Sequence, residues 1–179
     1  LGGPRKPRRG PRKPRRGPGN GFGGVLVMST QKTCSIVLGI DPGISTGLAH
    51  YSGGKLVKLE TVNPFQLVTA ILAANADLVV YEDSRRQSHV WSAHGNIDQK
   101  MKIARNVGQV DAWCWLIEEA CKQYSIKCSG VSPKGKGHKL SGPAFDDMTG
   151  WAGQSNQHCR DAAMVAWPYR MTKRKKETA

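Results

Sequence analysis

The sequence predicts an α/β fold: a mixed five-stranded sheet, with three antiparallel strands followed by parallel ones, and helices on both faces. Two observations lead to this prediction. Three strand-like segments follow one another with only short glycine-containing turns between them, which favours an antiparallel meander. Later strand-like segments alternate with helical ones, in the overall order βββαβαβα, and a strand–helix–strand unit makes its two strands parallel. A chain of 179 residues has room for one such domain of ordinary size.

Each expected strand is a short apolar or β-branched run that ends at a turn signal. The first runs to Asp41 and ends in a glycine turn, and Gly53-Gly54 joins the second strand to the third. The five expected strands cover residues 35–41, 46–52, 55–62, 77–82 and 127–132.

The expected helices have recognisable start and stop signals. Asn63 followed by Pro64 is an N-cap with proline at the first helical position, and it predicts a helix that turns apolar side chains inward. Those inward side chains are Phe65, Val68, Ile71 and Leu72. A long amphipathic helix is expected over residues 97–124, where apolar residues recur at alternating spacings of four and three. That stripe consists of Ile103, Val107, Val110, Cys114, Ile117, Cys121 and Tyr124. A short helix over 143–149 and a last helix over 156–167, stopped by Pro168, complete the order.

The formal net charge of +14 is concentrated at the two ends of the chain. Residues 1–24 carry eight basic residues and no acidic one, and residues 170–179 carry five basic residues and one acid. Little net charge is left for the middle of the chain. This distribution excludes a uniformly basic, histone-like protein.

The domain organisation follows from composition. Residues 1–34 contain PRKPRRG twice in tandem and a glycine-rich stretch, so we expect a disordered basic segment there. Two interpretations of it stay open: an arm that binds nucleic acid, or translated upstream sequence that is not native before Met28. Residues 35–170 form the expected folded domain. Residues 171–179 are a basic tail that either contacts phosphate or is simply solvated.

Cysteine content and hydropathy bear on the compartment. The five cysteines are odd in number and include no CxxC pair, which supports neither a disulfide framework nor a zinc ribbon. The sequence has no apolar run of 18 residues and no signal-peptide core. We therefore expect a cytoplasmic protein, in a bacterium or in the host of a virus, with no membrane partner.

The first motif that carries chemistry is GIDPGISTG, residues 39–47. It places Asp41 at the carboxyl end of the first strand, where a parallel-type sheet presents its ligand site. The flanking glycines allow another backbone or a phosphate to come close. The simpler alternative is an aspartate that only caps a turn.

A second acidic position ends the fourth strand. Alternation along the strand sends Glu82 and Asp83 to opposite faces, so only one of them shares a face with Asp41. Glu82 is the better candidate, because Asp83 opens a polar loop and is expected to face water.

The third motif, SNQHCRDAAMVAW, lies on the last helix. His158 and Asp161 are three residues apart, so they face the same way. Taken alone, the pair is best interpreted as a surface histidine and an acid that interacts favourably with the N-terminal end of the helix dipole. With Asp41 and Glu82 nearby, a cation becomes the better interpretation, because three acids repel one another unless a positive charge neutralises them.

These motifs resemble the RuvC family of Holliday-junction resolvases, in the ribonuclease H-like superfamily, and particularly its phage-type members. The family pattern of a first-strand GIDPGxxxTG is matched by residues 39–47, and its glutamate at the end of the fourth strand by Glu82. Its final-helix [H/D]xxDA is matched by His158, Asp161 and Ala162. The similarity covers residues 35–168, including Gly108-Gln109, and departs in the loop after the fourth strand and in the tails.

The resemblance implies a ribonuclease H-like fold and a metal-dependent endonuclease that resolves four-way or branched DNA. Oxygen-rich ligands with one imidazole suit two Mg²⁺ ions, for which Mn²⁺ substitutes, and no organic cofactor is implied. Asp41 would bridge the ions, Glu82 and Asp161 would each hold one, and His158 would ligate an ion or orient the attacking water. All four are thus the expected catalytic and metal-binding residues.

DNA contacts are expected from three basic groups and one aromatic residue. Trp91 is the aromatic, and by resemblance to a junction-probing side chain it would stack on bases. The basic groups lie in the loop after the fourth strand, at the start of the long helix and in the glycine-rich loop before the short helix. Their members are Arg85 and Arg86; Lys100, Lys102 and Arg105; and Lys134, Lys136 and Lys139.

A junction cut twice with two-fold symmetry calls for a homodimer. Trp113 and Trp115 lie off the apolar stripe of the long helix, and they would either meet a twin helix or pack under the protein's own loops. Two other functions stay open: a ribonuclease H-fold nuclease with another branched or RNA-containing substrate, and a non-catalytic nucleic-acid-binding protein.

Overall fold

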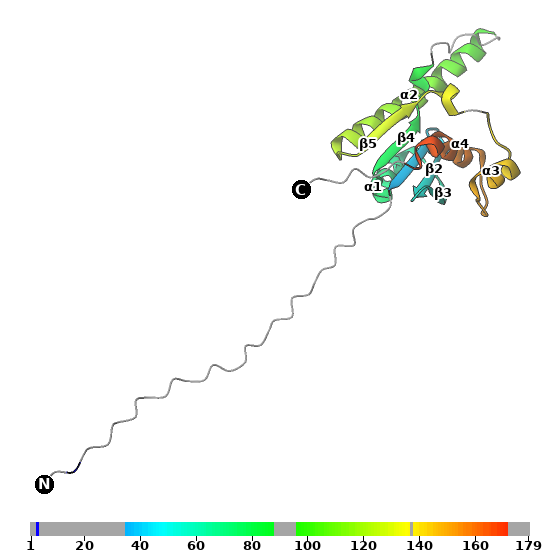
Figure 1. The fold of residues 1–179 in the computed structure, drawn as a ribbon. Helices are drawn as coiled ribbons and strands as arrows, with labels where there is room; N and C mark the ends of the chain where they lie inside the picture. The colour runs from blue at the N-terminus through cyan, green and yellow to red at the C-terminus, as the bar shows by residue number, and fades with distance from the viewer. Residues whose placement is uncertain (1–2, 4–34, 88–95, 137, 172–179) are drawn as a thin grey trace. The chain divides into compact units, whose positions relative to one another are not determined.

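A five-stranded mixed sheet forms the centre of the domain (Figure 1). The structure is a computed structural model, and it describes residues 3, 35–87, 96–136 and 138–171. Along the sheet the strands lie in the order β3-β2-β1-β4-β5. Their bounds are β1 Ile36–Asp41, β2 Thr46–Ser52, β3 Lys55–Val62, β4 Leu78–Glu82 and β5 Lys127–Val131. The helices are α1 Leu67–Ala74, α2 Ile97–Gln123, α3 Gly142–Thr149 and α4 Gln157–Ala166.

The pairing of the strands confirms the predicted mixed sheet. β1 pairs with β2, and β2 with β3, in antiparallel fashion, whereas β1 with β4 and β4 with β5 are parallel pairs. The turn between β2 and β3 needs two residues with positive φ, and Gly53 (φ 58°) and Gly54 (φ 83°) supply them without steric cost. Short turns thus force the first three strands into a meander, and helical crossovers make the other two parallel.

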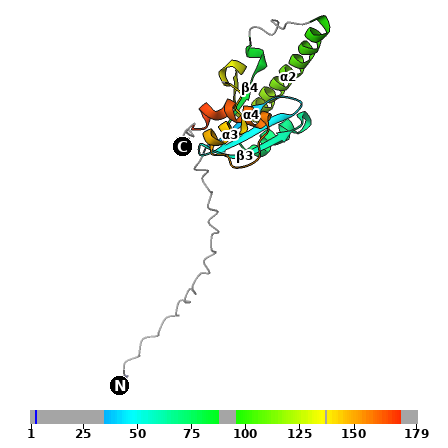
Figure 2. The ribbon, with the colours of Figure 1, turned by 90° about the vertical axis from the view of Figure 1, so that its right-hand side faces the viewer.

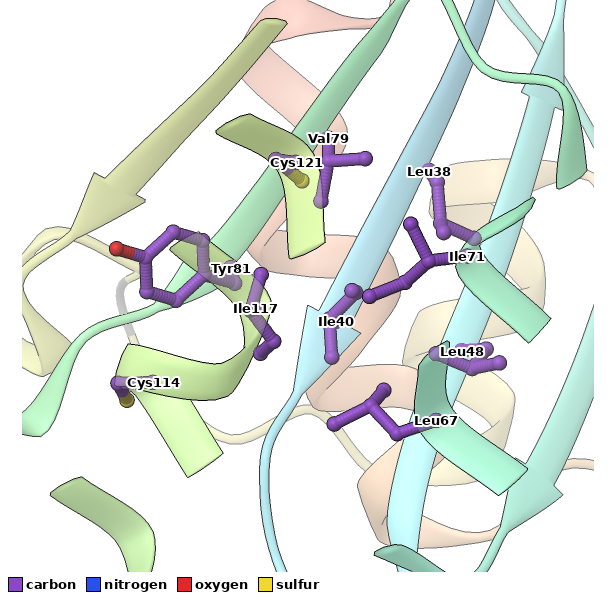
Figure 3. Close-up of a cluster of buried hydrophobic side chains, with 10 residues drawn as sticks. All are labelled: Leu38, Ile40, Leu48, Leu67, Ile71, Val79, Tyr81, Cys114, Ile117 and Cys121. Atoms are coloured by element: carbon purple, nitrogen blue, oxygen red, sulfur yellow. The ribbon is translucent and has the colours of Figure 1, made fainter. Parts of the chain in front are cut away.

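One face of the sheet is covered by α1 and α2 (Figure 3). Ile71 of α1 and Ile117 of α2 lie over Ile40 and Tyr81, side chains of the two central strands. The full cluster comprises Leu38, Ile40, Leu48, Leu67, Ile71, Val79, Tyr81, Cys114, Ile117 and Cys121. Because successive strand residues point to opposite faces, the neighbouring positions in β1 and β4 face the other way.

The opposite face is covered by α4, with Phe145 of α3 added to the same cluster. Strand residues Val37 and Val80 pack here against small helix side chains. The buried members are Val37, Ala49, Tyr51, Val80, Phe145, Ala162, Ala163, Val165 and Ala166. Helices therefore lie on both faces, as the sequence predicts.

Two expectations about the helices are wrong in detail. Phe65 is 97% exposed and Leu72 is also exposed, because Pro64–Gln66 form a 3₁₀ turn and the α-helix begins only at Leu67. The two side chains that α1 buries are Leu67 and Ile71. A 3₁₀ turn advances by a different angle per residue than an α-helix. The apolar positions counted from Phe65 with the α-helical period therefore do not all face the sheet.

The long helix α2 is buried only in its C-terminal half. Cys114, Ile117, Ala120 and Cys121 are its buried residues, whereas Ile103 and Tyr124, two members of the expected stripe, are exposed. Both views show the N-terminal half of α2 extending beyond the sheet (Figure 2). Within the residues that the structure describes, no helix combines the length and the apolar character needed to cross a membrane.

Candidate active site where β1, β4 and α4 meet

The carboxyl ends of the two central parallel strands carry Asp41 and Glu82. The register pairs Ile40 with Tyr81, so the two acidic residues follow at the same level of the sheet. Alternation places Asp41 with Val37, and Glu82 with Val80, on the face that α4 covers. The structure therefore brings both predicted carboxylates to one edge and one face of the sheet.

Helix α4 lies directly on the backbone of β1 and β2 because two glycines leave room for it. A Cβ atom at Gly47 would overlap the carbonyl group of His158, and one at Gly39 would overlap the carbonyl of Ala162. Since Gly47 pairs with Asp41 in the β1–β2 register, the close contact brings the first turn of α4 beside Asp41. The glycines of the GIDPGISTG motif thus admit another backbone, one of the two partners that the sequence allows.

His158 contacts Asp41 directly. Its Nδ1 atom lies 3.0 Å from Oδ2 of Asp41, within hydrogen-bonding distance. The Asp41 side chain is 13% exposed and the His158 side chain 50% exposed, so solvent reaches the pair from the imidazole side. Two residues 117 positions apart in the sequence are thereby joined at the end of the sheet.

Asp161 lies on α4, three residues beyond His158, and its side chain is only 7% exposed. Oδ1 accepts a hydrogen bond of 2.8 Å from Nε2 of Gln157. Nζ of Lys139 lies 3.8 Å from Oδ2. A buried carboxylate needs such partners, because burial without them is costly.

The start of α4 is also tied to strand β3. The N-cap side chain of Asn156 accepts from the backbone N–H of Cys159 at 2.9 Å and donates to Oγ1 of Thr61 at 2.8 Å. Cys159 is buried, and its Sγ donates to the carbonyl of Glu60, so it packs rather than reacts. The helix start that carries His158 is therefore fixed laterally as well as pressed onto the sheet.

The donor types at this edge fit a hard divalent cation, because three carboxylates and one imidazole are the ligands that Mg²⁺ and Mn²⁺ accept. Asp41 and His158 touch, while Asp161 is engaged with Gln157 and Lys139. Across residues 35–87, 96–136 and 138–171, no three His, Cys, Asp or Glu side chains lie close enough to hold a metal ion as they stand. The chemistry of the donors fits, and their side chains would have to turn toward one another.

A network of charged side chains lies on the other face of the sheet, beyond Glu82. Asp83 is buried, so the expectation that it faces water is wrong. Arg85 is the reason: its Nε donates to Asp83 Oδ1 at 2.7 Å, and its Nη1 donates to Glu118 Oε2 at 3.0 Å. The hydroxyl of Tyr81 donates to Glu118 at 2.5 Å. Glu118 is the member that sequence reasoning missed, because it lies 33 residues beyond Arg85.

The pKa values in this network have opposing causes. Burial pushes the pKa of Asp83 up, but the hydrogen bonds and charge of Arg85, helped by Arg86, hold it below its ordinary value. Hydrogen bonds from Arg85 and Tyr81 likewise lower the pKa of Glu118. Burial and the hydrogen bond to Glu118 raise the pKa of Tyr81, so its hydroxyl stays protonated. The network is therefore ionised at neutral pH and internally compensated.

The basic residues expected to contact DNA differ in their surroundings. The guanidinium of Arg85 is held between two carboxylates, whereas the Arg86 side chain is 58% exposed. Exposed positions on the surface are Lys100, Lys102, Arg105, Lys134 and Lys139. Trp91 and the Lys136 side chain lie outside the described residues. DNA binding by all of these residues stays a prediction.

Comparison with known proteins defines the fold. No family model matches the sequence, and no curated protein matches it. The solved structure of Thermus thermophilus RuvC in complex with a Holliday junction substrate is similar with a TM-score of 0.52, covering 77% of this chain and 96% of that chain at 16% identity. A second Thermus thermophilus RuvC structure covers 76% of this chain and 93% of its own, at 16% identity and a TM-score of 0.48. The chain has the α/β, ribonuclease H-like fold of RuvC.

Proposed function

We propose that this chain is a divalent-metal-dependent endonuclease that resolves four-way or otherwise branched DNA junctions. The observation that carries the proposal is the contact of His158 with Asp41, on the sheet edge and face that Glu82 shares. Two polar residues that served only to keep the surface hydrated would not be expected to meet from positions 117 residues apart in the sequence. The RuvC-like fold adds the expectation that such an edge cleaves DNA.

The ligands would be Asp41, Glu82, Asp161 and His158, with two Mg²⁺ ions or Mn²⁺ in their place. When bound, the metal would activate water and stabilise the charge that develops on the phosphate. Asp41 orients the imidazole of His158 through the 3.0 Å contact, so the other ring nitrogen would either ligate an ion or orient the attacking water. No organic cofactor enters the reaction.

Phosphate contacts would come from the exposed basic residues. On α2 these are Lys100, Lys102 and Arg105, and outside α2 they are Arg86, Lys134 and Lys139, of which Lys139 lies beside Asp161. Lys136 is a further expected phosphate contact. Arg85 is bound to two carboxylates, so it would contact phosphate only by giving up one of these partners. Lys139 lies next to Asp161. When a cation binds Asp161 and DNA enters the site, Lys139 would leave the carboxylate and contact a phosphate instead.

The active form would be a homodimer, because a symmetric junction needs two cuts related by two-fold symmetry. Trp115 is 64% exposed and Leu116 38% exposed on α2, which leaves apolar surface on that helix for a second copy. Sedimentation at rising protein concentration would detect the dimer.

Cleavage of labelled synthetic substrates in Mg²⁺ tests the proposal. We expect Asp41→Asn, Glu82→Gln and Asp161→Asn each to abolish junction cleavage and leave junction binding intact, because they remove ligand charge and not phosphate contacts. Asp147→Asn is the matched control: Asp147 is an exposed acid on α3, and its loss should cost little.

Substrate comparison separates the alternatives. Preferential cleavage of an RNA–DNA hybrid or linear duplex over a four-way junction would replace the proposed substrate. Binding of DNA with no cleavage of any substrate would instead support the non-catalytic interpretation. Cleavage within tenfold of wild type by one of the three variants would remove that residue from the site.

A further inference from the structure

The carboxylate of Asp161 is held by a chain of side chains that the proposed reaction has not used. Oδ1 of Asp161 accepts from Nε2 of Gln157 at 2.8 Å, and Oε1 of Gln157 accepts from Nη2 of Arg160 at 3.0 Å. Gln157 precedes Asp161 by four positions, so both lie on one face of α4. The three residues therefore form one hydrogen-bonded line along the first turns of the helix.

The orientation of the Gln157 amide is determined from both sides. A guanidinium has only donors, so Arg160 must face the amide oxygen. An ionised carboxylate has only acceptors, so Asp161 must face the amide nitrogen. Gln157 cannot flip without losing both bonds, and the donor to Oδ1 is thereby fixed.

Arg160 in turn is anchored to backbone outside α4. Its Nε donates to the carbonyl of Leu140 at 3.1 Å, and its Nη1 donates to the carbonyl of Ser155 at 2.8 Å and to Ser155 Oγ at 3.2 Å. Leu140 precedes α3 and Ser155 precedes α4, so the guanidinium joins two loops. The planar fork of arginine can make these bonds together, whereas a lysine ammonium is a single point.

We propose that Gln157 and Arg160 are positioning residues that set the rotation of the Asp161 carboxylate for a divalent cation. Oδ1 is turned toward Gln157, and Oδ2 is presented on the side of Lys139. The inference rests on the proposed function of Asp161 as a metal ligand. Neither residue needs to touch the substrate.

The test compares Gln157→Leu with wild type, because leucine is close to glutamine in size and has no hydrogen-bonding group. Mn²⁺ binding is measured by calorimetry on the full chain without DNA, and junction binding, junction cleavage and melting temperature are measured beside it. Loss of a residue that orients a metal ligand typically costs 10- to 100-fold in metal affinity or activity. We expect about that loss in Mn²⁺ affinity and in cleavage rate, with junction affinity unchanged.

Two further variants separate positioning from packing. Gln154→Leu makes the same chemical change at an exposed glutamine of the preceding loop, and its Mn²⁺ affinity should equal that of wild type. Arg160→Lys keeps the charge and loses the fork, so its Mn²⁺ affinity should fall as that of Gln157→Leu does. A purely structural role would lower the melting temperature of Gln157→Leu without changing Mn²⁺ affinity in the folded protein.

The outcomes distinguish this inference from the proposed function. Equal Mn²⁺ affinity of Gln157→Leu and wild type would overturn the positioning role, whatever the cleavage rates. Mn²⁺ binding that depends on Gln157, without cleavage of any junction, would overturn the proposed substrate and leave the positioning role standing. Wild-type protein that binds no Mn²⁺ would overturn both.

Discussion

Replacing Arg85 by methionine should destabilise the domain strongly, because Arg85 is the centre of the buried charge network beside β4. The substitution keeps an apolar stem and deletes the guanidinium that donates to Asp83 at 2.7 Å and to Glu118 at 3.0 Å. The Asp83 side chain is only 4% exposed, so it would be left as a buried charge with two weaker partners, Arg86 at 3.3 Å and the backbone N–H of residue 85 at 3.2 Å. Breaking a buried ion pair from one side typically costs about 3–5 kcal/mol.

The lower end of that range applies here, because Arg85 itself is 20% exposed and Arg86 remains. We therefore expect a loss of about 3 kcal/mol in the free energy of unfolding, and a melting temperature lower by roughly 10 °C for a domain of this size. Urea denaturation at pH 7 measures the first quantity and a thermal scan the second. Arg86→Met, at a 58% exposed position, is the control and should cost less than about 1 kcal/mol.

The pH dependence has a definite sign. Because Arg85 holds the pKa of Asp83 below its ordinary value, the pair stabilises the fold above the unfolded-state pKa of Asp83 and loses this effect as pH falls through the lower, folded-state pKa. In Arg85→Met the pKa of Asp83 rises, so acid neutralises the stranded charge. The loss in free energy of unfolding of Arg85→Met relative to wild type should therefore become smaller from pH 7 toward pH 4. A deficit no larger than that of Arg86→Met, or one that grows on acidification, would refute the reasoning.

Substitutions at Gly47 and Trp91, each with its control, address the site and its substrate. Gly47→Ala should lower thermal stability and nearly abolish cleavage, because its Cβ would overlap the His158 carbonyl; Gly108→Ala, with open space around its Cβ on α2, should instead stabilise by about 0.5–1 kcal/mol. Equal stability of both variants in thermal scans would mean that α4 does not lie where the structure puts it. Trp91→Ala should weaken junction binding by roughly 1–3 kcal/mol with little effect on linear duplex, and Trp91→Phe should restore most of it. A uniform weakening on all substrates with a lower melting temperature would make Trp91 a packing residue.

The order of the sheet and the relative orientation of neighbouring acidic residues could be predicted because both follow from local sequence periodicity. Side chains alternate along a strand, so Glu82 and Asp83 had to fall on opposite faces. The register between β1 and β4 is what puts Glu82 on the face of Asp41. On a helix, a spacing of three keeps His158 and Asp161 on one side. Short-range geometry gives the alternation and the helix spacing. The choice of Glu82 over Asp83 rested instead on the expected exposure of Asp83, which is wrong although the choice agrees with the register.

Burial of polar groups could not be predicted in the same way, because it depends on partners far along the chain. Asp83 begins a polar segment, and only the packing of α2 shows that Glu118 holds Arg85 in place while Arg85 compensates the charge of Asp83. The exposure of Ile103 also depends on tertiary packing, because the N-terminal half of α2 extends beyond the sheet that would cover it. Periodicity marks which side of a helix can be buried, and tertiary packing decides how much of its length is.

The first turn of α4 is constrained more tightly than burial of its apolar residues requires. Small buried side chains near its C-terminal end hold the helix on the sheet, yet packing of alanines alone tolerates small shifts along the strands. Polar bonds of defined geometry add the rest: Asn156 ties the start of the helix to β3, and Arg160 ties it to two loops. Gly47 has no side chain, and a Cβ atom there would push α4 away from the sheet. All three constraints act on the first turn of α4, which carries His158, so they fix its backbone where the contact with Asp41 forms.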